Sequence, residues 1–118
     1  MNQLNDLKHE DYCYLTTIGR VTGNPHENEI WFGLNHTTLY LLSGGKEKSD
    51  WVKNLLKNPS VTVRIASHTF NATARLVKDE AEETLARNML ADKYKERESD
   101  DSLSEWAQSA LVVGMDVG

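Results

Sequence analysis

The sequence contains a single cysteine, no long apolar run and few cations, and each shortage excludes a class of protein. With only Cys13, no disulfide can form within the chain, which favours a reducing compartment. No apolar run approaches the roughly 20 residues of a membrane span, and the amino-terminal residues have no apolar core of a secretion signal. The sequence therefore predicts a cytoplasmic protein without a membrane span.

The sequence also has fewer basic than acidic residues, with 13 Lys and Arg against 18 Asp and Glu and a net charge of −5. This balance argues against a general nucleic-acid binder, which needs a basic surface. The four histidines are scattered without metal-ligand spacing, and there is no nucleophile elbow or dinucleotide-binding glycine motif. We therefore predict no metal site and leave the catalytic residue unknown. Cys13 lies in the apolar run 12–15 and is interpreted as a buried structural thiol.

What the sequence does contain is a series of short strand patterns, and 118 residues suffice for one domain, 1–118, with one core. The pattern predicts six strands, of which the first three form a meander and the fourth and fifth a hairpin: 12–18, 26–34, 39–43, 60–67, 70–77 and 110–117. We expect a short helix after the third strand and a longer helix before the last. The fold class is mainly β, a six-stranded antiparallel sheet closed or half-closed into a barrel.

Helix boundaries follow from capping residues. Ser49 or Asp50 can cap the short helix, and Asn58-Pro59 ends it. The longer helix begins with a capping-box pattern, Asp79-x-x-Glu82, and runs to about residue 94. Its expected apolar stripe is Ala81, Leu85 and Met89 with Ala86 and Leu90, and Ser102 could cap one further turn that carries Trp106.

Two glycine-containing turns with cations are candidates for anion binding. In GRVTGNP (19–25), a guanidinium, a hydroxyl and exposed backbone N–H groups could meet a phosphate. In SGGKEKSDW (43–51), glycines allow close backbone approach, and lysines lie near a helix start. Both turns could also be ordinary solvated loops. Trp31 and Trp51 could stack on an aromatic ligand or serve as core or interface residues.

In order and spacing, these motifs resemble the deazaflavin-dependent nitroreductase family of the flavin-binding split barrels, which include pyridoxamine 5′-phosphate oxidase-like proteins. The resemblance covers about residues 14–65, through Gly-Arg-x-Thr-Gly-x-Pro, the Gly-Gly with a following Lys, Trp-x-x-Asn-Leu and Asn-Pro-x-Val-x-Val. It implies a six-stranded split β-barrel that forms a homodimer, with coenzyme F-420 (a deazaflavin) or, as in sister families, FMN near the dimer interface.

The resemblance also assigns cofactor-binding residues. Arg20, Thr22 and Gly23 match the turn that contacts phosphate. Ser43, Gly44 and Gly45 match the segment that approaches the cofactor. Lys48 matches a basic residue on the anionic tail, and Trp51 and Asn54 match helix positions that line the site.

The function implied is hydride transfer to a small electron-poor acceptor such as a quinone or nitroaromatic, with the chemistry supplied by the cofactor. Because Val21, Asn24 and His26 stand where basic residues often occur in deazaflavin enzymes, FMN remains an alternative cofactor. Two other functions remain open: a flavin-binding or storage module without turnover, and a cofactor-free dimeric barrel.

Overall fold

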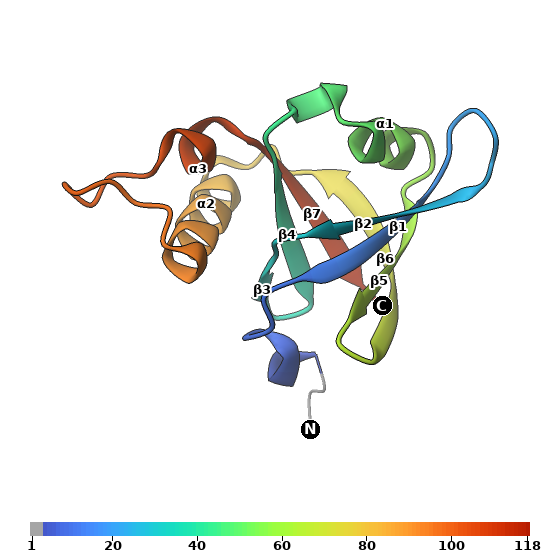
Figure 1. Cartoon of the computed structure of the whole chain (residues 1–118), viewed down its shortest axis with the longest axis horizontal. Coiled ribbons are helices and arrows are strands. Elements are labelled where there is room, and N and C mark those ends of the chain that lie inside the picture. The colour runs from blue at the N-terminus through green and yellow to red at the C-terminus, as the bar shows by residue number, and fades with distance from the viewer. Residues whose placement is uncertain (1–3) are drawn as a thin grey trace.

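The computed structural model describes residues 4–118, which form one antiparallel sheet with three α-helices (Figure 1). The strands follow the order β2-β1-β5-β6-β7-β4-β3 across the sheet. Their bounds are β1 Cys13–Ile18, β2 Pro25–Ile30, β3 Gly33–Asn35, β4 Thr38–Ser43, β5 Ser60–Ile65, β6 His68–Leu76 and β7 Leu111–Val117. The helices are α1 Asp50–Lys57, α2 Glu80–Tyr94 and α3 Glu105–Ser109, with short 3-10 turns at Asn5–Leu7 (η1) and Lys46–Lys48 (η2).

The sheet curls on itself, and its two edges show why. β2 and β3 are the opposite edge strands, yet only Trp31 and Phe32 separate them in the sequence. The Cα atoms of Ile30 and Gly33 are three residues apart and so at most about 11 Å from each other, which brings the two edges close together at this point. The result is the half-closed barrel seen in Figure 1, and the predicted mainly-β antiparallel barrel is confirmed.

The strand count and the predicted meander need correction. The expected strand 26–34 divides into β2 and β3, so seven strands form in place of six. The meander pairing is kept in part, because β2 pairs with β1 and only the short β3 pairs with β4. The cause lies at Phe32, whose N–H donates to the Tyr94 hydroxyl at 2.9 Å. Its carbonyl oxygen accepts from Lys93 Nζ, also at 2.9 Å. Both backbone groups are therefore bonded to α2 in place of a neighbouring strand.

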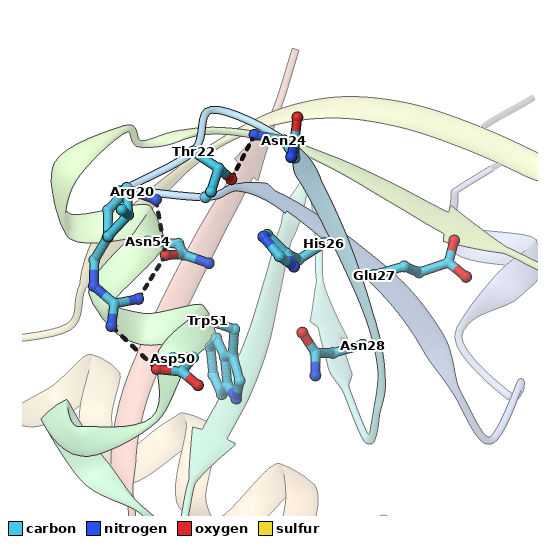
Figure 2. A pocket seen from close by; sticks show the side chains of 11 residues that line it. Arg20, Thr22, Asn24, His26, Glu27, Asn28, Asp50, Trp51 and Asn54 are labelled. Carbon is cyan, nitrogen blue, oxygen red and sulfur yellow. Dashed lines mark hydrogen bonds and ion pairs between the residues drawn. The ribbon is translucent and has the colours of Figure 1, made fainter.

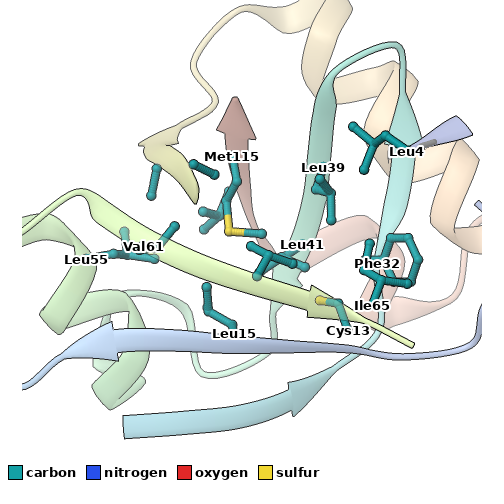
Figure 3. Packing of buried hydrophobic residues seen from close by; sticks show 14 of the residues in the cluster. Leu4, Cys13, Leu15, Phe32, Leu39, Leu41, Leu55, Val61, Ile65 and Met115 are labelled. Atoms are coloured by element: carbon teal, nitrogen blue, oxygen red, sulfur yellow. The ribbon is translucent and has the colours of Figure 1, made fainter. Parts of the chain in front are cut away.

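Two groups of buried side chains hold the barrel and its helices together. Inside the barrel, Leu15, Leu41 and Met115 are fully buried (Figure 3), and Val63 is fully buried in the same cluster. On the outer face of the sheet, Tyr40, Leu42 and Val112 pack with α2 residues such as Leu90. β4 is thus buried on both faces, which explains its continuous apolar sequence.

The helices begin close to where their caps predict. Asp79 accepts the Glu82 N–H at 2.9 Å, as predicted for α2. The predicted apolar stripe is partly wrong: Ala86 and Leu90 are buried together with Ala91, whereas Ala81 and Leu85 are exposed because they lie on the helix face that turns away from the sheet.

At α1 and α3 the capping differs from the prediction. Ser49 occupies the N-cap position of α1 without a side-chain cap bond, and its hydroxyl pairs with that of Ser43 at 2.8 Å. α3 is capped by Ser104, not by Ser102, whose hydroxyl donates to Asp100. None of the helices within residues 4–118 is long and apolar enough to cross a membrane.

Candidate functional site

A cavity of about 520 Å³ lies between the β1–β2 turn and the start of α1 (Figure 2). It is lined by residues 19–22 and Asn24 of the turn, by His26, Glu27 and Asn28 of β2, and by Asp50, Trp51 and Asn54 of α1, whereas Gly23 of the turn does not line it. The turn and α1 are far apart in the sequence: Arg20 and Asp50, for example, are separated by 30 residues. Four of the predicted residues, Arg20, Thr22, Trp51 and Asn54, line this one cavity.

Arg20 is the cation of the cavity, and α1 holds it in place. Asn54 Oδ1 accepts from the Arg20 backbone N–H at 3.2 Å and from its guanidinium at 2.8 Å. The buried Asn54 is fixed in turn by donating to Thr17 Oγ1 at 3.2 Å. The Asp50 carboxylate accepts a further bond from Arg20 at 3.1 Å. The guanidinium is therefore positioned, but part of its charge is neutralised.

The turn itself provides further hydrogen-bond donors. Gly23 has φ of 77°, a left-handed conformation that glycine adopts without strain. Thr22 Oγ1 accepts from the Asn24 N–H at 3.2 Å, which leaves its own proton available to donate. Among residues 4–118, no group accepts a hydrogen bond from the backbone N–H of Val21 or Thr22, and both residues are exposed to solvent. Such a set of N–H and hydroxyl donors suits an anion.

The inner face of β2 forms the wall opposite Trp51. His26, Asn28 and Ile30 pair with Thr17, Leu15 and Cys13, whose side chains are buried in the barrel. His26 and Asn28 are nevertheless exposed, because no other part of the described chain covers them. Glu27 points away from Arg20 and Trp51 in Figure 2 and lies 4.0 Å from Arg64.

The glycine-containing part of the second predicted segment, residues 43–48, lies outside this cavity, in the loop that leads from β4 to α1. Ser43 is buried, and its hydroxyl donates to the Lys46 carbonyl at 3.0 Å, so this group serves the loop itself. Gly45 has an internal reason to be glycine, since a Cβ there would lie 2.5 Å from Ser49 Oγ. The left-handed residue of the loop is Lys46, with φ of 54°. Lys48 is exposed in the 3-10 turn that follows.

Gly44 lies beside a second hollow, of about 380 Å³, which sequence reasoning missed. A Cβ on Gly44 would come within 3.5 Å of Trp106. The Trp31 ring stacks on Tyr94 with centroids 4.2 Å apart, and Trp106 meets Trp31 edge to face at 5.5 Å. Trp31 and Trp106 are isolated aromatic residues in the sequence, and only the fold brings them together.

Cys13 is fully buried, as predicted, and burial raises the pKa of its thiol to about 12. A thiol with so high a pKa carries almost no thiolate near neutral pH, so it is a structural residue. Among residues 4–118, no group of three or more His, Cys, Asp and Glu side chains is arranged to hold a metal ion.

The curled seven-stranded sheet, with a polar cavity where its edge strand meets α1, defines a protein of the split β-barrel class. Within that class, the chain belongs to the F420H2-dependent quinone reductase family, whose sequence profile matches residues 2–103. F420H2 is the reduced form of coenzyme F-420. The resemblance read from the motifs of residues 14–65 is thereby confirmed over most of the chain.

Solved structures share this fold at low sequence identity. A Listeria innocua protein named as a pyridoxamine 5′-phosphate oxidase has 21% identity and a TM-score of 0.72, covering 97% of this chain and 89% of its own. An F420H2-dependent reductase has 18% identity and a TM-score of 0.70, with coverages of 90% and 94%. HutZ, the heme storage protein of Vibrio cholerae, has 18% identity and a TM-score of 0.73, with coverages of 98% and 88%. At these identities the likeness shows the fold alone.

Proposed function

We propose that this protein is a deazaflavin-dependent oxidoreductase that reduces a quinone or a similarly electron-poor small molecule with coenzyme F-420. The observation that carries the proposal is the α1-anchored Arg20, beside unpartnered N–H groups and Trp51, in a chain of the F420H2-dependent quinone reductase family. The cavity beside Arg20 has a volume of about 520 Å³, which lies within the range of about 300–1,000 Å³ that is typical of small-molecule sites.

The residues of the cavity fit a phosphate-bearing cofactor with an aromatic ring. The Arg20 guanidinium, the Thr22 hydroxyl and the N–H groups of Val21 and Thr22 would bind the phosphate. Trp51 would pack beside the ring, while Asn54 would hold Arg20 in position. The backbone of Ser43, Gly44 and Gly45 would approach the cofactor, and Lys48 would meet the anionic tail.

The bound cofactor would supply a hydride, and a quinone that takes up this hydride and one proton becomes a hydroquinone, while the cofactor is oxidised by two electrons. The protein binds and orients both molecules and keeps water out. No side chain of the cavity is needed as a nucleophile.

We further propose that a second copy of the chain covers the exposed inner face of β2. In a stable monomer, side chains paired with core residues would ordinarily be buried, yet His26 and Asn28 are exposed. A structural neighbour with 18% identity is described as a domain-swapped dimer. Sedimentation velocity should give the mass of a homodimer, and Asn28→Lys should shift the protein toward the monomer.

Titration of the purified protein with coenzyme F-420 and, separately, with FMN tests the cofactor. We expect fluorescence changes on binding of F-420 and weaker changes with FMN. Arg20→Ala with Lys48→Ala should weaken F-420 binding by about 3–6 kcal/mol, since each of the two lost hydrogen bonds to a charged group is worth about 1.5–3. Lys8→Ala with Lys78→Ala removes the same charge from exposed positions and should leave affinity almost unchanged.

Asp50 makes the same test sharper. Because its carboxylate shares the Arg20 guanidinium, Asp50→Asn should free this cation and tighten anion binding. If neither the Arg20 change nor the Asp50 change alters affinity, the phosphate is bound elsewhere.

A storage or binding module is the alternative function, because one structural neighbour, HutZ, is a heme storage protein. Turnover with reduced F-420 and menadione or a nitroaromatic separates the two functions. Bound cofactor without turnover on any acceptor would favour the module, and no affinity for either cofactor would favour a cofactor-free barrel.

A further inference from the structure

We infer that the hollow lined by Trp31 and Trp106 is the acceptor site, and that it selects uncharged planar rings against anionic ones. This inference rests on the proposed function, because it names the substrate class of the same oxidoreductase. The hollow lies at the far end of β2 from the Arg20 turn and has a volume of about 380 Å³, which is enough for one or two fused rings.

The walls of the hollow are mostly aromatic and aliphatic. Tyr12, Ile30, Trp31, Leu42 and Trp106 line it. Trp31 is held rigid between the parallel Tyr94 ring and the edge of Trp106. Tyr94 is itself fixed, since its hydroxyl accepts the Phe32 N–H at 2.9 Å. Rigid aromatic walls suit a planar ring because stacking costs little conformational entropy when the partner is already ordered.

The polar residues of the hollow are both acidic. Glu29 and Glu96 line it, and none of the described residues that line it is basic. Each carboxylate is held in place: Glu29 accepts from the Tyr14 hydroxyl at 2.8 Å, and Glu96 accepts from Ser104 Oγ at 3.0 Å. Two fixed carboxylates repel an anion and leave a neutral ring unaffected. The charge of the walls therefore separates neutral quinones from sulfonated or carboxylated ones.

The position of the hollow also fits an acceptor. β2 borders both cavities, with Asn28 on the Arg20 side and Ile30 on the Trp31 side. The loop from β4 to α1 connects the two regions, because a Cβ on Gly44 would lie 3.5 Å from Trp106 of the hollow and the loop ends at Asp50, the first residue of α1, which lines the first cavity. A ring in the hollow would therefore lie beside the loop segment that we assign to the cofactor.

The inference is tested without cofactor, by tryptophan fluorescence of Trp51→Phe protein titrated with menadione and with a naphthoquinone sulfonate. The substitution removes the tryptophan of the first cavity and leaves Trp31 and Trp106 as reporters. Menadione should quench this emission at saturating concentration, and the sulfonate should bind at least about tenfold more weakly. Free N-acetyltryptophanamide, titrated in parallel, corrects for collisional quenching.

Two sets of variants locate the binding. Glu29→Gln with Glu96→Gln keeps the hydrogen bonds to Tyr14 and Ser104 and should remove most of the difference between the two quinones. Tyr12→Ala should weaken menadione binding about fivefold through the lost ring contact. Leu85→Ala is the matched control, because Leu85 is 44% exposed on α2 and Tyr12 is 43% exposed, and it should change nothing.

The outcomes separate this inference from the proposed function. If menadione quenches the emission selectively but the protein binds no F-420, the hollow is still a site for neutral rings and the proposed oxidoreductase function is wrong. If the protein turns over with F-420 but Glu29→Gln with Glu96→Gln does not change its selectivity between the two quinones, the oxidoreductase proposal stands and the hollow is not the acceptor site. Emission of Trp31 and Trp106 that changes with protein concentration and not with menadione would show that a second copy of the chain occupies the hollow, and would also overturn the inference.

Discussion

Asn54 Oδ1 accepts two hydrogen bonds from Arg20, one from its backbone N–H and one from its guanidinium. One buried amide thus fixes both the course of the β1–β2 turn and the direction of its cation. Since Asn54 also donates to the fully buried Thr17, the cavity is tied to the barrel interior through a single α1 side chain.

Replacement of Asn54 should therefore disturb both stability and cofactor binding. Asn54→Ala leaves the Arg20 N–H and Thr17 Oγ1 without partners, at a cost of about 2–3 kcal/mol in unfolding free energy, because a buried polar group left unpaired costs about 1–3. Urea unfolding measures this cost, and F-420 titration measures the accompanying loss of affinity.

Thr17→Val serves as the control, because it removes only the bond from Asn54 Nδ2 and leaves Arg20 held. It should lower stability and retain F-420 affinity. Equal loss of affinity in both variants would mean that Asn54 acts through general stability and not through Arg20.

The two glycines of the β4–α1 loop should respond differently to alanine. A Cβ at Gly45 would meet Ser49 Oγ at 2.5 Å, so Gly45→Ala must turn that hydroxyl away and break its 2.8 Å bond to Ser43, at about 1 kcal/mol. A Cβ at Gly44 comes no closer than 3.5 Å to Trp106, which is an ordinary contact, so Gly44→Ala should change stability little.

A double-mutant cycle in urea unfolding checks this explanation. If the Gly45 cost arises from Ser49 Oγ, Gly45→Ala with Ser49→Ala should cost no more than Ser49→Ala alone. Strictly additive costs would mean that the constraint on Gly45 does not come from Ser49 Oγ.

Local sequence patterns predicted the elements whose stabilising contacts lie close in the chain. β5 was predictable because Val61, Val63 and Ile65 alternate and all three are buried, and β6 follows after a tight turn. The start of α2 was predictable because its cap, Asp79, lies three residues from the N–H that it accepts. In both cases the signal and its physical cause are within a few residues of each other.

What could not be predicted depends on distant partners. The break between β2 and β3 is set by Tyr94, which lies 62 residues after Phe32. The same holds for the candidate cofactor site. The sequence shows that Arg20 is a cation in a glycine-containing turn, but not that Asp50, 30 residues away, pairs with it and neutralises part of its charge. Alternation within 26–34 carried no information about either partner.

Lys93 should make stability rise with pH in a narrow alkaline range. Burial against Phe32 lowers the pKa of its ammonium group to about 8 from 10.5, opposed by the nearby Asp11, Cys13 and Glu10. Between these two values the unfolded chain binds the proton more readily than the folded one, so unfolding free energy increases as pH rises. Below about pH 8 the full cost of burying the charge is present.

The measurement is the urea midpoint of wild type and Lys93→Met from about pH 7 to pH 9. Comparison of the two proteins cancels the contribution of Cys13, whose pKa is raised by burial to about 12 from 9.0 and which lowers the stability of both as pH approaches 9.0. Lys93→Met should abolish the rise, and Lys8→Met, at an exposed position, should retain it. A rise that persists in Lys93→Met would come from another group.

Arg75 should have the opposite pH signature, in acid. Its guanidinium donates to Glu82 at 2.9 and 2.7 Å and to Asp116 at 2.7 Å, and so lowers the pKa of both carboxyls. Carboxyls with lowered pKa stabilise the fold above their ordinary values of 4.5 and 3.8, and this stabilisation is lost as pH falls below them.

Arg75→Met should thus lower unfolding free energy at neutral pH by about 1 kcal/mol, a modest value because these side chains are partly exposed. The difference from wild type should shrink as pH falls below about 4.5, where Glu82 and then Asp116 take up protons in the unfolded chain. Arg75→Lys keeps the charge but loses the two-pronged contact with Glu82, so it should fall between the two. A stability difference that stays constant from neutral to acid pH would mean that Arg75 acts through the packing of its guanidinium group over Gly114 and not through its charge.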